Sequence, residues 1–301
     1  MSLLVVGSVA FDSIDTPEGV VDEVLGGSAS YFGYVASFFA PVRLVGVVGN
    51  DFPGEFLDLL GERPIDLSGL ETREEGSTFR WRGRYTGSMN EAETLQVELN
   101  VLEDHQPRIP DKFLDSEYVF LANTAPRTQR HVLAQMTAAR FSVCDTMNLW
   151  IETERSELLG LFREVDCVVL NDGEARLLTE FDNLIKAARR IQEMGPKHVV
   201  IKKGDNGALL ASGSVMSALP AFPMERVVDP TGAGDSFAAG MMGYLAEVDG
   251  QVDAEALRAA VARGIVAASF TIEDFSLGRL RRTSRDEIEG RLARFRAMLT
   301  L

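Results

Sequence analysis

Two kinds of hydrophobic pattern alternate along this chain of 301 residues. Apolar runs without polar interruption, such as 167–170 (CVVL) and 199–201 (VVI), are typical of strands buried on both faces. Between them lie segments whose apolar residues recur three and four positions apart, which predicts amphipathic helices. The alternation predicts an α/β doubly wound fold, with a mostly parallel sheet between two layers of helices. We expect strands at 3–7, 43–48, 118–121, 141–145, 166–170, 198–202, 208–211, 215–218 and 226–228, and helices at 28–40, 52–61, 128–139, 172–179, 184–194, 236–247, 254–272 and 284–299.

One region departs from this rhythm. Residues 78–85 (TFRWRGRY) and 94–101 (TLQVELNV) alternate in polarity and flank a turn at 86–90, which predicts half-exposed antiparallel strands. Together with 20–24 they can form a small sheet inserted into the larger fold. From the pattern alone, this sheet either covers a cleft or decorates the surface.

Composition and charge narrow the class of protein. The formal net charge is −15, so neither nucleic acid nor an anionic membrane is an expected partner, and an anionic nucleotide needs a local positive site or a bound cation. The two cysteines lie in apolar runs and are expected as buried thiols, and the three histidines lack metal-ligand spacing. Residues 1–7 run directly into a strand without a basic segment or a long apolar span. We expect a cytoplasmic enzyme.

The stretch 229–240 (DPTGAGDSFAAG) carries the most chemical information. Gly232, Ala233 and Gly234 leave backbone N–H groups uncovered where an apolar helix is predicted to begin, and this predicts an anion site. Asp235 follows at once, and a carboxylate beside a bound phosphate has no structural benefit. The combination predicts phosphoryl transfer to a hydroxyl group, with Asp235 as the proton acceptor.

These twelve residues closely resemble the C-terminal signature of the ribokinase-like, PfkB-type kinases of sugars and nucleosides. The resemblance implies an ATP-dependent kinase that uses Mg²⁺ and phosphorylates a hydroxymethyl group. It also implies that the small sheet is a lid over the cleft. We expect a large α/β domain that binds nucleotide and acceptor, made of residues 1–13, 26–75 and 102–301, and a β lid made of 14–25 and 76–101, through which two chains can pair as a homodimer.

For the acceptor, the resemblance points to two segments. Asp12 follows the first predicted strand, at the sheet edge where open α/β folds bind ligands, and a carboxylate suits a sugar diol because it accepts two hydrogen bonds. Gly26 and Gly27 match the family's paired-glycine motif. Tyr31 stands where many sugar kinases of the family have Asn. Trp81 is expected on the lid, over the acceptor.

For the nucleotide, the resemblance implies a second group of residues. Asn171 and Glu174 form an Asn-x-x-Glu motif that organises Mg²⁺ through water, and the same pair also reads as a helix capping box. The turn 203–207 is expected as the nucleotide loop. The segment after Pro220 and the helix at 259–269 are expected to admit adenine, and 143–150 resembles a segment at the phosphate end of the cleft. Lys203, Gly204, Gly207 and Thr231 are the expected nucleotide-binding residues, and Asp229 matches a region that binds a K⁺-like ion in many family members.

The sequence disfavours three alternatives to this kinase. A sensing protein without turnover is disfavoured because Asp235 and the glycines are intact. A dinucleotide oxidoreductase is disfavoured because no Gly-x-Gly-x-x-Gly follows the first strand, and no GxxxxGK[ST] P-loop occurs. The acceptor stays open between a sugar, which the family label favours, and a ribonucleoside. Aromatic residues at Phe11, Tyr31, Phe79, Trp81 and Tyr85 favour stacking on a base, although a sugar face or core packing explains them as well.

Overall fold

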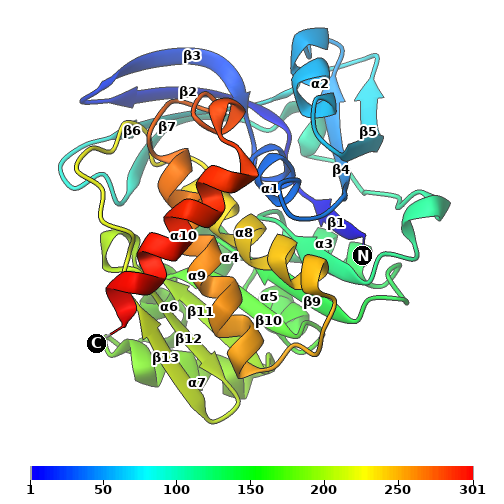
Figure 1. The fold of residues 1–301 in the computed structure, drawn as a ribbon. Helices are drawn as coiled ribbons and strands as arrows, with labels where there is room; N and C mark the ends of the chain where they lie inside the picture. The colour runs from blue at the N-terminus through cyan, green and yellow to red at the C-terminus, as the bar shows by residue number, and fades with distance from the viewer. Residues whose placement is uncertain (1, 301) are drawn as a thin grey trace.

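The structure is a computed structural model and describes residues 2–300. Its centre is a nine-stranded sheet with the order β13-β12-β11-β10-β9-β8-β1-β4-β5, in which β12 alone runs in the opposite direction to the other strands (Figure 1). The inner parallel strands, β1 and β8 to β11, are short, largely apolar and almost fully buried, as expected for strands with no solvent-facing side, whereas the edge strand β5 is half polar and only partly buried. The bounds of the strands in this sheet are β1 Leu3–Val6, β4 Val42–Gly49, β5 Ile65–Arg73, β8 Tyr118–Leu121, β9 Phe141–Asp145, β10 Cys167–Asn171, β11 His198–Lys202, β12 Ala208–Ser212 and β13 Val215–Leu219.

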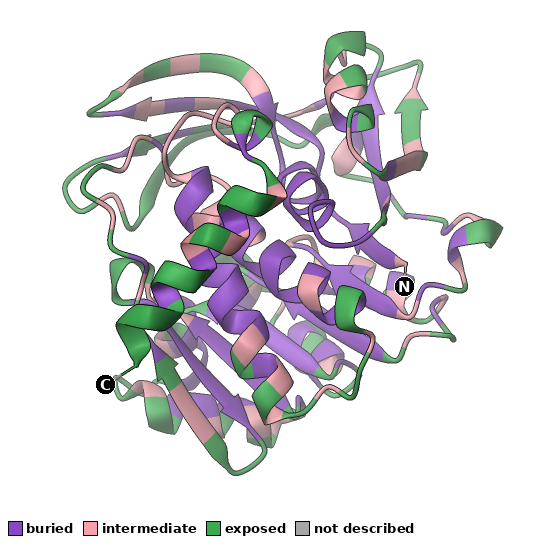
Figure 2. Cartoon of the chain, viewed as in Figure 1, coloured by how far each residue is buried: buried purple, intermediate pink, exposed green. Residues whose placement is uncertain are grey.

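Helices cover both faces of this sheet, and each face has its own apolar core (Figures 1 and 2). On β8, for example, Phe120 stacks on Phe32 of the first helix with 4.3 Å between ring centroids, while Val119 lies in the opposite core. The doubly wound fold is therefore confirmed. One core is closed by α1 Ser28–Ala36, α8 Ala233–Val248, α9 Ala254–Thr271 and α10 Arg285–Leu299, the other by α3 Pro126–Leu133, α4 Asn148–Thr153, α5 Arg155–Phe162, α6 Asp172–Thr179 and α7 Leu184–Met194, and α2 Gly54–Gly61 packs beside α1 and β5.

A second sheet, here called the lid sheet, has the order β3-β2-β6-β7. Its strands are β2 Ala10–Thr16, β3 Gly19–Gly26, β6 Phe79–Tyr85 and β7 Ala92–Glu98. The predicted hairpin of β6 and β7 is confirmed, but β2 pairs with β6 in parallel, which the sequence did not indicate. The division of the chain into two domains at the predicted boundaries stays a prediction.

Several predicted elements differ from the structure. Residues 226–228 form no strand, because Val228 N–H donates to Ile272 O in another loop instead of joining a sheet. Helix α1 ends four residues early, since the Ser37 hydroxyl donates to Tyr34 O at 2.5 Å and tightens the last turn. Strands β2 and β5 and helices α4 and α5 were not predicted.

Candidate active site

Helix α8 begins inside the glycine-rich motif, three residues earlier than predicted. Gly232 precedes its first turn with φ +74°, a left-handed conformation that favours glycine. Ala233 N–H donates to Pro230 O at 3.1 Å, so the turn already satisfies this amide. Within residues 2–300, the N–H groups of Gly232 and Gly234 have no hydrogen-bond partner. Two of the three predicted amides therefore remain available to an anion at the positive end of the helix.

Asp235 lies in the first turn of α8, close to other charged side chains. Burial raises its pKa most, Asp145 and Asp12 raise it further, and Lys202 lowers it, which leaves the pKa at about 8. A proton acceptor works best when its pKa lies near the working pH. The environment of Asp235 therefore suits the role predicted for it.

Three neighbouring parallel strands end in polar residues at the same edge of the sheet. Asp145 is the last residue of β9, Asn171 of β10 and Lys202 of β11. Residues two positions earlier belong to the core under α8 and α9, so strand alternation puts all three side chains on the α8 side of the sheet. Lys202 Nζ lies 3.4 Å from Asp145 Oδ2.

Asn171 and Glu174 form a capping box at the start of α6. Asn171 Oδ1 accepts from Glu174 N–H, and Glu174 Oε2 accepts from Asn171 N–H, both at 2.7 Å. Burial and the nearby Asp145 raise the pKa of Glu174 to about 7, although Lys202 acts against them. In the described part of the chain, no group of three His, Cys, Asp or Glu side chains is placed to hold a metal ion. The carboxylate of Glu174 and the side-chain amide of Asn171 supply oxygen donors of the kind that Mg²⁺ takes.

The predicted acceptor residues meet where the lid sheet joins α1. Asp12 follows the first strand along the chain, as predicted, but it lies on β2 of the lid sheet and not at the edge of the main sheet, because the chain leaves β1 at Val6 and starts a new strand at Ala10. A Cβ atom at Gly26 would lie 2.0 Å from Asp12 Cγ, so only glycine leaves room for this carboxyl group. Burial and the nearby Asp229 raise the pKa of Asp12 to about 7, although a hydrogen bond from Gly27 N–H acts against them.

Tyr31 joins this group from helix α1. Its hydroxyl group is buried and has no hydrogen-bond partner among the described residues. Burial, Asp12 and Asp229 all raise the pKa of Tyr31. A buried hydroxyl group without a partner beside two carboxyl groups indicates a place for a polar ligand atom.

Trp81 lies on the same face of the lid sheet as Asp12, because the two residues are paired across β2 and β6. Its indole ring covers Gly83, where a Cβ atom would lie 2.1 Å from the ring, and its Nε1 donates to Thr94 Oγ1 at 3.3 Å. Tyr85, two residues beyond Gly83, accepts a hydrogen bond from Thr231 Oγ1 at 3.3 Å. Tyr85 thus fastens the lid sheet to the motif before α8, which the sequence did not indicate.

The predicted nucleotide loop borders a cavity of about 770 Å³. Gly204 and Gly207 have φ +53° and +82°, and a side chain on Gly207 would meet the carbonyl of Leu219. Asn90, at the tip of the β6–β7 hairpin, donates to Asp205 at 3.4 Å. Cavity-lining residues include Arg84, Asn90, Asn171, Lys203, Gly204 and Asp205.

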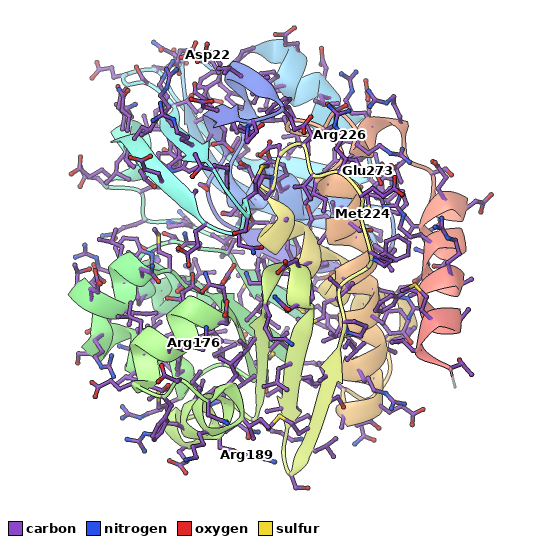
Figure 3. All side chains as sticks on the ribbon, turned by 90° about the vertical axis from the view of Figure 1, so that its left-hand side faces the viewer. Asp22, Arg176, Arg189, Met224, Arg226 and Glu273 are labelled. Carbon is purple, nitrogen blue, oxygen red and sulfur yellow. The ribbon has the colours of Figure 1, made fainter. Side chains whose placement is uncertain are left out.

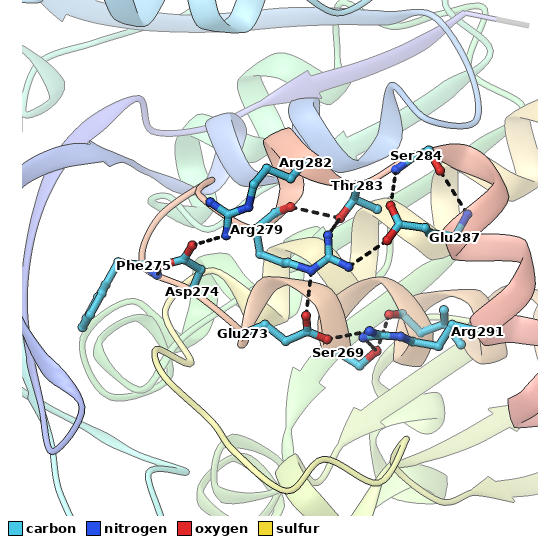
Figure 4. Close-up of polar contacts among 11 residues, drawn as sticks. Ser269, Glu273, Asp274, Phe275, Arg279, Arg282, Thr283, Ser284, Glu287 and Arg291 are labelled. Atoms are coloured by element: carbon cyan, nitrogen blue, oxygen red, sulfur yellow. Dashed lines mark hydrogen bonds and ion pairs between the residues drawn. The ribbon is translucent and has the colours of Figure 1, made fainter.

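Asp229 is buried beneath the loop between α9 and α10. It accepts hydrogen bonds from Thr231 N–H at 2.8 Å and Ser276 N–H at 3.5 Å. Burial raises its pKa to about 6 against these bonds. The loop is held by Glu273, which accepts from Arg279 at 2.7 Å and Arg291 at 2.5 Å (Figure 4).

The lid sheet is also fastened to the loop that joins β13 to α8. Arg226, labelled in Figure 3, lies on this loop and pairs with Glu18 in the β2–β3 turn at 2.5 Å. Thr16 Oγ1 donates to Val228 O at 2.9 Å. These contacts, like the position of Lys202, escaped the sequence prediction because they join segments far apart in the chain. For Lys202 a signal existed, since its odd–even position in a buried strand gives its direction.

A doubly wound sheet, a lid sheet and this cluster at the carboxyl edge define a class of kinases that transfer phosphate to a hydroxyl group. The profile of the pfkB family carbohydrate kinases matches residues 2–281. The chain belongs to this family and is an ATP-dependent kinase.

Individual relatives agree with this membership. A cytidine kinase from Thermococcus kodakarensis is 32% identical over 255 residues, covering 81% of this chain and 88% of that protein. The structure of a nucleoside kinase from Methanocaldococcus jannaschii has a TM-score of 0.76 at 20% identity and covers 97% of this chain and 98% of that one. A ribokinase from Thermotoga maritima has a TM-score of 0.75 at 21% identity, with 97% and 99% covered. At such identities the two structures show the shared fold alone. In residues 2–300 no helix is long and apolar enough to span a membrane.

Proposed function

We propose that this kinase phosphorylates the 5′-hydroxymethyl group of a ribonucleoside. The observation that carries this proposal is the pairing of Asp12 with Trp81 on one face of the lid sheet. A carboxylate suits the two ribose hydroxyl groups, and an indole ring suits a flat base next to them. A small sugar would use the carboxylate and would cover less of the ring than a base does.

The relatives support the same acceptor class. The cytidine kinase of T. kodakarensis covers most of this chain at 32% identity, and a nucleoside kinase shares the fold. A sugar remains the second candidate because the family profile describes carbohydrate kinases and a ribokinase shares the fold as well. The unpartnered Tyr31 hydroxyl group is consistent with either acceptor.

In the proposed reaction, Asp235 accepts the proton of the acceptor hydroxyl group. The oxygen lone pair forms a bond to the γ-phosphorus of ATP, the bond from that phosphorus to the β–γ bridging oxygen breaks, and ADP leaves with the electron pair. The N–H groups of Gly232 and Gly234 stabilise the charge on the transferred group. Ala233 contributes its small size and not its N–H, which Pro230 O already uses.

We assign the ions and the nucleotide to the remaining predicted residues. Asn171 and Glu174 would hold Mg²⁺ through water, and the ion would neutralise phosphate charge. Lys203 and Gly204 would contact the nucleotide at the cavity under the lid tip, and Gly207 and Thr231, which do not line this cavity, would contact it from outside the cavity. A K⁺-like ion would sit beside Asp229, where a buried carboxylate already receives two backbone N–H groups.

Two further expectations stay proposals. Strand β7 forms one edge of the lid sheet, and Leu95 and Val97 are exposed on it, which supports a homodimer that pairs through the lid. Sedimentation equilibrium of the full chain tests this. A cytoplasmic location is a prediction from the composition.

A panel of acceptors tests the proposed function. The purified chain is assayed for ADP release with Mg²⁺ATP and cytidine, uridine, inosine, adenosine, ribose, fructose or no acceptor. We expect kcat/KM for at least one nucleoside to exceed that for every free sugar by 10²-fold or more, because stacking of a base contributes a factor of about this size to binding. Efficient turnover of a free sugar alone would replace the nucleoside with the second candidate.

A further inference from the structure

None of the predicted roles involves Lys202, although it lies at the centre of the site. It ends β11, and strand alternation turns its side chain toward α8. A Cβ atom at Gly234 would lie 2.9 Å from Lys202 Nζ. The ammonium group therefore lies directly against the first turn of α8, beside the two free amides and Asp235.

The hydrogen bonds of Lys202 leave most of its donors unused. The side chain is 18% exposed, and within residues 2–300 its one hydrogen bond goes to Asp145 Oδ2 at 3.4 Å. Burial lowers the pKa of Lys202, but Asp145, Glu174 and Asp235 outweigh burial and raise it, so the group stays charged. A largely buried ammonium group with three donors and one long contact indicates an anion as its missing partner.

The surrounding charges identify that anion. Asp145, Glu174 and Asp235 gather at this edge of the sheet, and Asp12 of the lid sheet is near enough to raise the pKa of Asp235, in a chain with a net charge of −15. The phosphates of ATP would be repelled there unless a cation faces them. Lys202 lowers the pKa of Asp235, the proposed proton acceptor. Its charge therefore lies close to the place where the phosphoryl group would pass from ATP to the acceptor.

We propose that Lys202 is a further catalytic residue whose ammonium group binds the γ-phosphoryl group of ATP during transfer, an inference that rests on the proposed function. The ammonium group keeps its protons throughout. It stabilises the charge on the phosphoryl oxygens while the acceptor oxygen bonds to phosphorus and the bond to ADP breaks. The competing explanation is a structural ion pair with Asp145.

Binding measurements without an acceptor separate these explanations. The dissociation constants of ADP and of a non-hydrolysable ATP analogue are measured by calorimetry with Mg²⁺ for the full chain. The variants are Lys202→Met, Lys202→Gln and the double variant Lys202→Met with Asp145→Asn, which leaves no unpaired buried charge if the single variants fail to fold. Lys197→Met is the matched control, because Lys197 is exposed and precedes the opposite end of the same strand.

We expect each Lys202 variant to lose about tenfold or more of the preference for the triphosphate over ADP and about 10²-fold or more in kcat. The Lys197 variant should match the wild type. An unchanged preference in the folded variants, or one restored to the wild-type value in the double variant, would overturn the proposal. If the wild type phosphorylates no acceptor while the Lys202 variants still lose the preference, the proposed function fails and the phosphate contact stands.

Discussion

The ring of Tyr31 lies directly against Gly232. A Cβ atom at Gly232 would come within 2.4 Å of ring atoms of Tyr31. Tyr31 belongs to the paired-glycine segment and Gly232 to the start of α8, so this contact brings the proposed acceptor site and the anion site together.

Gly232→Ala should therefore damage both folding and activity. A left-handed φ costs a non-glycine residue about 1–2 kcal/mol, and the methyl group must also push Tyr31 away. We expect a lower melting temperature in calorimetry and a loss of kcat. Gly61→Ala, where a Cβ atom meets nothing within 4 Å, is the matched control. If the Gly232 variant were as stable as the wild type, Tyr31 would move aside without cost and this prediction would be wrong.

Asp235→Asn should abolish turnover and leave ATP binding nearly unchanged. The amide keeps the shape of the side chain but cannot accept the hydroxyl proton, and the loss of a general base costs about 10²-fold or more. Coupled ADP release gives kcat, and calorimetry gives the ATP affinity. Turnover at the wild-type rate would rule out the proposed base.

The pH dependence of kcat/KM should show an acidic limb near pH 8. Burial raises the pKa of Asp235 to about 8, and a base works only when deprotonated, so activity rises with pH up to that value. Asp12 and Glu174, with raised pKa values of about 7, act in the same direction. Asp235 alone gives about a tenfold rise between pH 6 and 7, so we expect a rise of at least that size. A flat profile from pH 6 to 9 would contradict the raised pKa of the base.

Asp12→Ala should weaken acceptor binding far more than ATP binding. Loss of a charged hydrogen-bond partner costs about 1.5–3 kcal/mol, which is a factor of about 10 to 150 in affinity. Separate titrations with acceptor and with ATP measure the two effects. If ATP affinity falls and acceptor affinity does not, the acceptor does not bind at Asp12.

Trp81→Ala should distinguish a nucleoside from a sugar. Stacking on a base is worth about 1–3 kcal/mol, so nucleoside affinity should fall by tens of fold. For a small sugar, the loss should be smaller and should appear as ATP hydrolysis without transfer, because an incomplete lid admits water. Val20→Ala is the control, since Val20 is exposed on lid strand β3. A Trp81 variant equal to wild type in affinity and coupling would remove the main support for the nucleoside.

The sequence by itself determined the layers of the fold and predicted the chemistry of its main motif. Uninterrupted apolar runs are typical of strands covered on both sides, so residues 167–170 and 199–201 indicated a parallel sheet between helices. Glycines followed at once by Asp235 predicted an anion site with a carboxylate beside it, and that role stays a prediction. The local sequence pattern is sufficient for these predictions because the residues on which each one rests are neighbours in the chain.

Only the tertiary structure decided which residues from distant segments meet. Asp12 proved to lie on a lid strand because β2 pairs with β6, about seventy residues away. Lys202 reaches Gly234 and Asp145 because three strand ends share one edge of the sheet. Such contacts depend on strand order and register. Many strand orders and registers fit the same local pattern, and only the packing of the whole chain selects one of them.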